Sequence, residues 1–273
     1  HEGGPVDDQW HPLSGGTEVR FHPFAWEEGY TVCFSARDQL VSRITKIEGH
    51  VLTLADAANR SATDAVVRHS DDAALQAAVE AAIKQQRNLR IPPGHYRLAR
   101  GIVIRKASSL TVQGDNPETV VLDISEGNGT CVTLAGGNEV NLKNLTMIGH
   151  MGLENADQAG YMNTLGGRGL WGFYLKTSGA VAIADTERVF VENCHARRMS
   201  QEAFVSGGGS RDSKPPRTHT KATTYLRCSA IDCARNGFND WNLGPENTSV
   251  LYCRIVDVGG CSWEGASRFV RFV

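Results

Sequence analysis

The sequence predicts an all-β chain whose larger part is a solenoid of stacked β coils. Three observations support this class: an amphipathic helix pattern early in the chain, an abrupt end to that pattern at two prolines, and short β-prone stretches that repeat from there onward. Self-similarity at a period of about 20 to 50 residues is the sequence sign of a solenoid.

Composition limits the classes of function. The chain has 273 residues, enough for one large domain or two ordinary ones, with 28 basic and 30 acidic residues. A charge balance near zero argues against a general attraction to nucleic acid or to an anionic membrane surface. No apolar run reaches the roughly 18 residues that a membrane span needs. We therefore expect neither a nucleic-acid partner nor a membrane partner.

Residues 1–69 are expected to form a small β module with a loose N-terminus. Residues 1–16 are rich in glycine and polar side chains, and the β-prone runs 30–34 and 40–47 follow. The second run leads through a Gly49-His50 turn to Val51–Leu54, which predicts an antiparallel pair. A packing or capping role is favoured over a separate binding module.

A helix is predicted over residues 71–87. Ser70 or Asp71 is a suitable N-cap, and the apolar face repeats every four residues, at Leu75, Val79 and Ile83. The helix must end before Pro92, because proline removes a backbone donor and restricts the preceding residue to extended geometry. LRIPPGHYRL, residues 89–98, therefore converts a helix into a strand, a turn and a second strand.

Cysteine positions set the register of the repeats that follow. The stretches beginning at Leu110, Val140, Val189, Tyr225 and Val250 read alike. Aligning Cys194, Cys228 and Cys253 gives steps of 34 and 25 residues, and places Phe204 and Phe238 each ten residues after a cysteine. Stacked coils bring equivalent side chains to within about 4.8 Å, so the three cysteines are expected to form an interior ladder.

The seven cysteines argue for free thiols rather than a metal site. They contain no C-x-x-C pair and fit no zinc-ribbon spacing. Adjacent rungs of a solenoid rarely offer disulfide geometry, and an odd number leaves at least one thiol unpaired. We expect neither a metal ion nor another cofactor.

The order of these features resembles the pectate-lyase-like superfamily. The helix with DDAALQAAVEAA, then IPPGHYRL, then Ile102–Ile104, then SSLTVQGDNPETVVLDI is similar to the N-terminal entrance of its right-handed parallel β-helix. Polysaccharide lyases, glycoside hydrolases and phage tailspikes share that fold. The resemblance covers about residues 70–273. It implies that the helix covers the open end of the solenoid, with Pro92-Pro93-Gly94 as the corner into the first coil.

The resemblance also implies that a sugar chain binds across one face, along a stacked strand and its turns. We expect that strand to be built from Gly172–Lys176, Glu202–Ser206, Gly237–Trp241 and Ser267–Val270. If the phenylalanines point inward, alternation sends a substrate-binding strip outward, made of Tyr174, Lys176, Asn239, Trp241 and Arg268. An ordinary solvated strand face is an equal alternative.

The catalytic candidates are Asp240 and Glu202, with His195 and Arg235 as basic partners and with Glu246 and Glu264 as further carboxylates. A hydrolase needs two carboxylates, about 5 Å apart for retention or roughly 6.5 to 9.5 Å for inversion. Glu202 and Asp240, on neighbouring rungs, could approach that separation. A lyase needs a cation for the substrate's carboxylate and a base, which could come from Tyr174, Lys176, His195 or Arg235.

The sequence departs from the hydrolases of this superfamily. The polygalacturonase-like set of Asn-x-Asp, Asp-Asp, Gly-His-Gly and Arg-x-Lys is not intact, and Asn239-Asp240 is a weak echo of it. The last residues, 271–273, lie in an apolar β run without a cap. We therefore expect only the first coils of a longer solenoid, with a second polypeptide or another copy covering the open coil.

These observations predict a secreted or periplasmic enzyme that cleaves a polysaccharide, as a glycoside hydrolase or as a polysaccharide lyase. The alternative is a carbohydrate-binding or tailspike-like adhesion module without catalysis. The sequence does not name the sugar.

Overall fold

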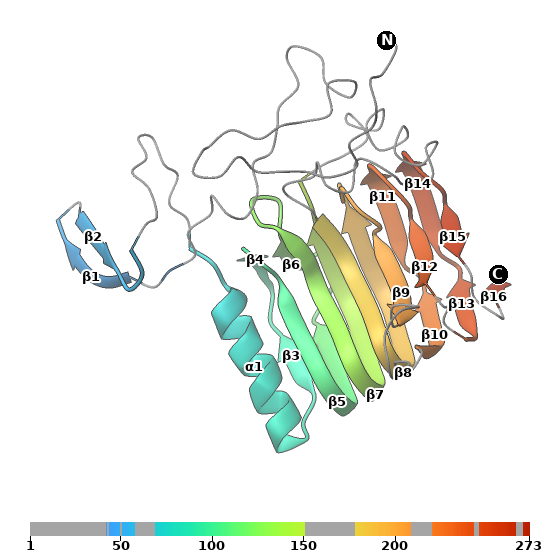
Figure 1. The fold of residues 1–273 in the computed structure, drawn as a ribbon, viewed down its shortest axis with the longest axis horizontal. Helices are drawn as coiled ribbons and strands as arrows, with labels where there is room; N and C mark the ends of the chain where they lie inside the picture. Colours follow the sequence, from blue (N-terminus) through green and yellow to red (C-terminus); the bar gives the residue numbers. More distant parts are fainter. Residues whose placement is uncertain are drawn as a thin grey trace, which may run out of the picture.

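The computed structural model describes residue 42 and residues 44–49, 51–57, 69–150, 178–208, 220–242, 246–265 and 270–273. The larger part of these residues winds into a right-handed parallel β-helix, with one helix at its N-terminal end (Figure 1). The predicted fold class is confirmed. The helix is not long and apolar enough to cross a membrane.

Two strands before the solenoid form an antiparallel pair. Strand β1 (Ile44–Glu48) pairs with β2 (Val51–Leu54), and Glu48 lies opposite Val51 across Gly49, whose φ is +56°. A turn with positive φ favours glycine, because a residue with a Cβ is strained there. The pair agrees with the hairpin predicted around Gly49, whereas residues 1–41 lie outside the described residues.

Helix α1 (Asp72–Gln85) closes the N-terminal end of the solenoid. It is three residues shorter than the predicted 71–87, and its buried face consists of Leu75, Val79 and Ala82. The Gln76 side chain accepts a hydrogen bond from Val103 N at 2.8 Å and donates one to Val103 O at 3.0 Å. Asp72 accepts another from Ala99 N at 2.8 Å. The helix thus satisfies backbone groups that the first rung would otherwise leave unpaired.

The strands stack in parallel on three faces. The first face contains the N-terminal parts of β5 (Ile102–Gly114), β7 (Gly129–Ile148) and β8 (Ser178–Arg197), then β9 (Phe204–Gly208), β12 (Phe238–Asn242) and β15 (Trp263–Gly265). The second face contains β3 (Leu89–Ile91), the later parts of β5, β7 and β8, then β10 (Lys221–Leu226), β13 (Thr248–Leu251) and β16 (Val270–Phe272). The third face contains β4 (Gly94–Arg97), β6 (Val120–Asp123), the ends of β7 and β8, then β11 (Ser229–Cys233) and β14 (Arg254–Val258). Pro92 and Pro93 form the corner between β3 and β4, as predicted.

The interior confirms the register set by the cysteines. Ser229 pairs with both His195 and Arg254, so the residues before them, Cys228, Cys194 and Cys253, lie on adjacent rungs, and all three thiols are free. Phe204 and Phe238 stack with ring centroids 4.9 Å apart. Tyr225 packs edge-on against Phe238 at 5.1 Å, and all three rings are buried.

The strand assignment was wrong for the last coil of the first face. Trp263, not a residue of Ser267–Val270, lies opposite Phe238, and Val270 instead pairs with Thr248 on the second face. The reason is that coil length varies: Phe204 to Phe238 spans 34 residues, but Phe238 to Trp263 spans 25. On the other side Phe204 pairs with Val181. Gly172–Lys176 lies outside the described residues.

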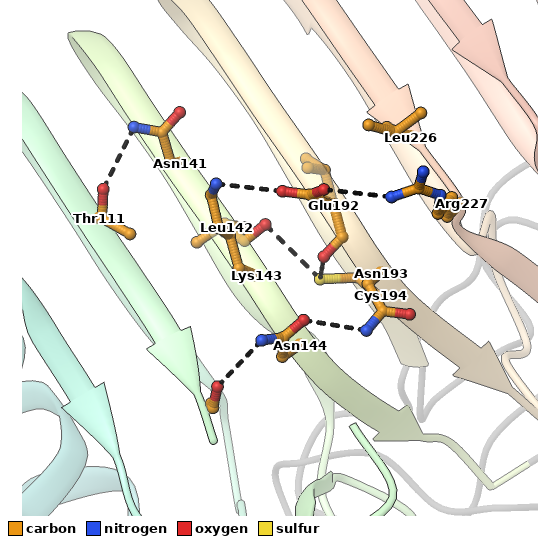
Figure 2. A network of polar contacts seen from close by, with 12 residues as sticks. Thr111, Asn141, Leu142, Lys143, Asn144, Glu192, Asn193, Cys194, Leu226 and Arg227 are labelled. Atoms are coloured by element: carbon orange, nitrogen blue, oxygen red, sulfur yellow. Dashed lines mark hydrogen bonds and ion pairs between the residues drawn. The ribbon is translucent and has the colours of Figure 1, made fainter. Parts of the chain in front are cut away.

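Asparagines form the corner between the second and third faces. Asn144 and Asn193 have φ values of 55° and 51°, in the left-handed region that asparagine tolerates better than most residues. Asn193 Nδ2 donates to Asn144 Oδ1 at 2.9 Å, and Asn144 Nδ2 donates to Gly114 O at 3.4 Å (Figure 2). This ladder links the same corner in successive coils.

Candidate functional site

A buried polar cluster lies where the third face turns back to the first. Glu202 stands two residues before the interior Phe204, and Asn236 stands two residues before the interior Phe238. Because Phe204 pairs with Phe238, these two corner positions are neighbours in adjacent coils. Asn239 follows in β12, on the opposite side of the strand from Phe238. The stacked phenylalanines therefore fix where the cluster stands.

Glu202 is the centre of this cluster. Its Oε1 accepts a hydrogen bond from Arg235 Nη1 at 2.5 Å and another from Asn239 Nδ2 at 3.1 Å. The Arg235 and Glu202 side chains are 3 % and 8 % exposed, so the pair is almost fully removed from solvent. A charge-assisted bond of this length holds the carboxylate in one orientation. Glu202 Oε2 makes no hydrogen bond with another described residue.

A second carboxylate adjoins the cluster. Glu264, an exposed residue of β15, lies beside Asn239 in the next coil. Asn236 Nδ2 donates to Glu264 Oε2 at 2.5 Å, while Asn236 Oδ1 accepts from Cys261 N at 2.8 Å. The coils of Glu202 and Glu264 are two rungs apart, which is roughly 10 Å along the solenoid axis.

Asp240 points to the other side of the same strand. It is 3 % exposed, and its Oδ1 accepts a hydrogen bond from Ser206 Oγ in the adjacent rung. It shares the inward side of β12 with Phe238, so it does not share the strip that carries Asn239. Burial, and secondarily the Asp240 charge, raise the pKa of Tyr225 well above its ordinary value. The expectation that Asp240 and Glu202 occupy one strip is not met.

His195 lies on the third face and is not brought to the cluster. It is paired in register with Ser229, and its Nδ1 is 2.8 Å from Ser229 Oγ. Burial, followed by the charge of Arg197, lowers the pKa of His195 below its ordinary value. The neutral form is therefore favoured where the side chain stands.

The structure does not describe the side chains of four further residues that were predicted to bind substrate. Tyr174, Lys176 and Arg268 lie outside the described residues, and Trp241 is described only as a backbone position of β12. Asn239 does occupy an outward position, but it is 2 % exposed and is bonded to Glu202 rather than presented to solvent.

Sequence reasoning missed Asn236 and did not pair Glu264 with the cluster. The signal for Asn236 was its offset of two residues before Phe238, which matches that of Glu202 before Phe204. The signal for Glu264 was the ten-residue offset from a ladder cysteine to an interior aromatic residue. Counted from Cys253, this offset leads to Trp263. Glu264, the next residue, is therefore expected to point outward. Within the described ranges, no group of three or more histidine, cysteine, aspartate or glutamate side chains could hold a metal ion.

The stacked strands define a right-handed parallel β-helix, the fold that the resemblance implied. No family model and no curated protein matches the sequence. Among solved structures, the Agl-KA catalytic domain aligns with a TM-score of 0.56 and 16 % identity, over 73 % of this chain and 32 % of that one. The catalytic unit of a thermostable GH87 α-1,3-glucanase from Streptomyces thermodiastaticus strain HF3-3 aligns with a TM-score of 0.51 and 17 % identity, over 75 % of this chain and 32 % of that one. This chain thus spans about a third of either protein, and the likeness shows the fold alone.

Proposed function

We propose that this protein cleaves glycosidic bonds of a polysaccharide and that Glu202 is a carboxylate of the reaction. The observation that carries the proposal is the Glu202–Arg235 pair, which is buried at a corner of the solenoid and braced by Asn239. A buried charged pair is costly to maintain, and well-packed apolar residues often serve stability as well or better. Its retention beside a second carboxylate is therefore better explained by chemistry than by stability.

The geometry supports a hydrolase better than a lyase. In a glycoside hydrolase one carboxyl group protonates the leaving oxygen, while the other activates water or attacks the sugar. Glu202 stands at the corner and Glu264 in the strand that follows that corner two rungs on, so their axial step of roughly 10 Å is a minimum separation, just above the range for inversion. A lyase needs a cation for the substrate's carboxylate, whereas Arg235 is engaged by Glu202.

Asp240 stays a proposed second carboxylate, but its place inside the solenoid makes Glu264 the better partner for Glu202. Trp241, Tyr174, Lys176 and Arg268 stay proposed as substrate-binding residues, and His195 as a basic group of the lyase alternative. A secreted or periplasmic location is likewise proposed, since a polysaccharide substrate is met outside the cytoplasm.

A polysaccharide screen tests the reaction. The protein is incubated with neutral glucans, including α-1,3-glucan, and with polygalacturonate and alginate, and new reducing ends and the ultraviolet absorbance of unsaturated uronates are followed. New reducing ends without absorbance support a hydrolase. Reducing ends with absorbance support the lyase alternative. If neither signal rises above that of Glu202→Gln on any substrate, the enzymatic proposal fails.

The partner that the non-catalytic alternative expects at the last coils is favoured by one observation. Tyr252, Phe272 and Val273, in the last coils, are 69 %, 54 % and 55 % exposed. Exposed apolar side chains beside strand edges invite pairing, so we propose that another polypeptide or another copy of this chain covers them. Sedimentation equilibrium should show an assembly larger than a monomer. A trimer that binds glycans without cleaving them would support adhesion, and a strict monomer would contradict self-association.

A further inference from the structure

A hollow lies on the second face, on strands that do not carry the Glu202 cluster. It is an open groove of about 400 Å³, and its lining comes from five successive coils, from Asn88 before β3 to Thr224 in β10. Pairing between the rungs aligns four outward residues in its floor: Thr111, Asn141, Phe190 and Thr224. Figure 2 shows the part of this row formed by Thr111 and Asn141.

The row combines hydrogen-bonding groups with one aromatic surface. Asn141 Nδ2 donates to Thr111 Oγ1 at 3.3 Å, which orients the amide along the groove. Phe190 is only partly buried, and Lys143 Nζ lies 5.3 Å from the centroid of its ring. Outward positions of a solenoid need no phenyl ring for core packing. A partly exposed ring between an amide and a hydroxyl suits a ligand with alternating apolar and hydroxylated surfaces.

Charges beside the row are already balanced. Arg188 Nη2 lies 3.0 Å from Glu139 Oε1, and Glu139 Oε2 accepts from Ser109 Oγ at 2.8 Å. Lys143 Nζ lies 3.0 Å from Glu192 Oε2. Each cation would have to give up a carboxylate partner in order to bind an anion. The balance favours an uncharged ligand over a uronate polymer or a nucleic acid.

We propose that this groove binds a neutral polysaccharide that runs along the solenoid axis. Phe190 stacks on the apolar face of a sugar ring, and Thr111, Asn141 and Thr224 form hydrogen bonds with its hydroxyl groups. One outward side chain of the row recurs at every rung, with about 4.8 Å between rungs along the solenoid axis. This regular spacing matches a linear polymer of repeating units better than a compact ligand. The inference does not rest on cleavage at Glu202, because binding is measured without turnover.

Affinity gel electrophoresis tests the groove. Native gels contain dextran, galactomannan, xyloglucan or mixed-linkage β-glucan, or else polygalacturonate or alginate as acidic probes. We expect at least one neutral polymer to retard the protein. Phe190→Ala should weaken that binding about tenfold, the effect of losing one stacking contact, and Phe190→Tyr should bind within about twofold of the parent. Val51→Ala, which shortens an exposed apolar side chain of β2 outside the groove, is the control and should bind as the parent does.

Other results overturn the proposal. They are retardation by none of the neutral polymers, retardation by acidic polymers alone, or equal binding by Phe190→Ala and the parent. Binding that is lost in Glu202→Gln but kept in Phe190→Ala would place the glycan at the first-face corner instead. Thermal unfolding of each variant shows whether a loss of binding comes from misfolding. If Phe190→Ala unfolds early, Asn141→Ala and Thr224→Ala repeat the test at the same row.

Discussion

Replacing Glu202 with glutamine removes one charge from a buried pair while nearly keeping the shape of the side chain. Glutamine retains an Oε1 that can accept from Arg235 Nη1 and from Asn239 Nδ2, the two donors that Glu202 Oε1 now binds. The variant therefore keeps the local geometry and loses the ability to exchange or to share a proton at Oε2.

The expected loss of rate is larger than any effect of unfolding. General acid–base assistance by one group is worth about 10² to 10⁴ in rate, and the same loss is expected in kcat. Leaving the buried Arg235 without its countercharge costs about 3 to 5 kcal/mol. A domain with roughly 5 kcal/mol of stability would still be at least about half folded. Unfolding alone therefore cannot lower turnover a hundredfold.

The assay measures initial rates of reducing-end release on the polysaccharide found by screening, with kcat and KM separated and the unfolding midpoint recorded. Glu192→Gln is the matched control, because Glu192 is also paired, with Lys143 at 3.0 Å and Arg227 at 3.7 Å, but lies outside the corner. It should keep kcat within about twofold, since no proton-transfer group is lost. An unchanged kcat in Glu202→Gln would refute the assignment. A hundredfold loss confined to Asp240→Asn would move the chemistry to the inward carboxylate.

The remaining predictions concern stability. Phe238→Ala opens a cavity beneath Phe204 and should cost about 3 to 5 kcal/mol in urea unfolding; a cost under about 1 kcal/mol would mean that the aromatic stack does not set the register. Asn144→Ala strains a left-handed position and removes the bond from Asn193, for a loss of about 2 kcal/mol, and Asn144→Gly should lose less because glycine adopts that φ without strain. The lowered pKa of His195 makes the unfolded state the stronger proton binder. The contribution of His195 to the free energy of unfolding is therefore present above the ordinary pKa of 6.5, and it is lost as the pH falls through the lowered pKa of the folded state. In His195→Gln the free energy of unfolding should depend less steeply on pH in this range. An unchanged slope would contradict this.

The interior of the fold was readable because a solenoid repeats its contacts. Aligning three cysteines placed Phe204 and Phe238 on adjacent rungs, and the structure stacks their rings at 4.9 Å. The same ten-residue offset leads from Cys253 to Trp263, but the prediction placed the strand of this shorter coil at Ser267–Val270. Backbone pairing sets the register of strands within a face, but it does not set the number of residues in the turns that connect the faces. The strands could therefore be predicted from the sequence better than the length of each coil.

The site was readable in part. Glu202, Arg235 and Asn239 were candidates because polar residues flank the phenylalanines, and the structure brings these three together. Asp240 was expected beside them on the strength of its carboxylate, although period-two alternation puts it on the side of Phe238. The interior accepts it because Ser206 supplies a hydrogen bond. Asn236 stands in a turn, where alternation does not tell which way a side chain points.

Position within the coil explains why the two proposed sites differ in kind. The Glu202 corner lies in the turn between the third and first faces, just before β9 and β12. A corner of this kind can bring side chains from different coils around one carboxylate, as Arg235 and Asn239 surround Glu202. The second face from β5 to β10 keeps unbroken register, so Thr111, Asn141, Phe190 and Thr224 remain in a straight row. A straight row can follow a polymer but cannot converge on one bond. We therefore expect variants of the row to change affinity for long chains and variants of the corner to change kcat.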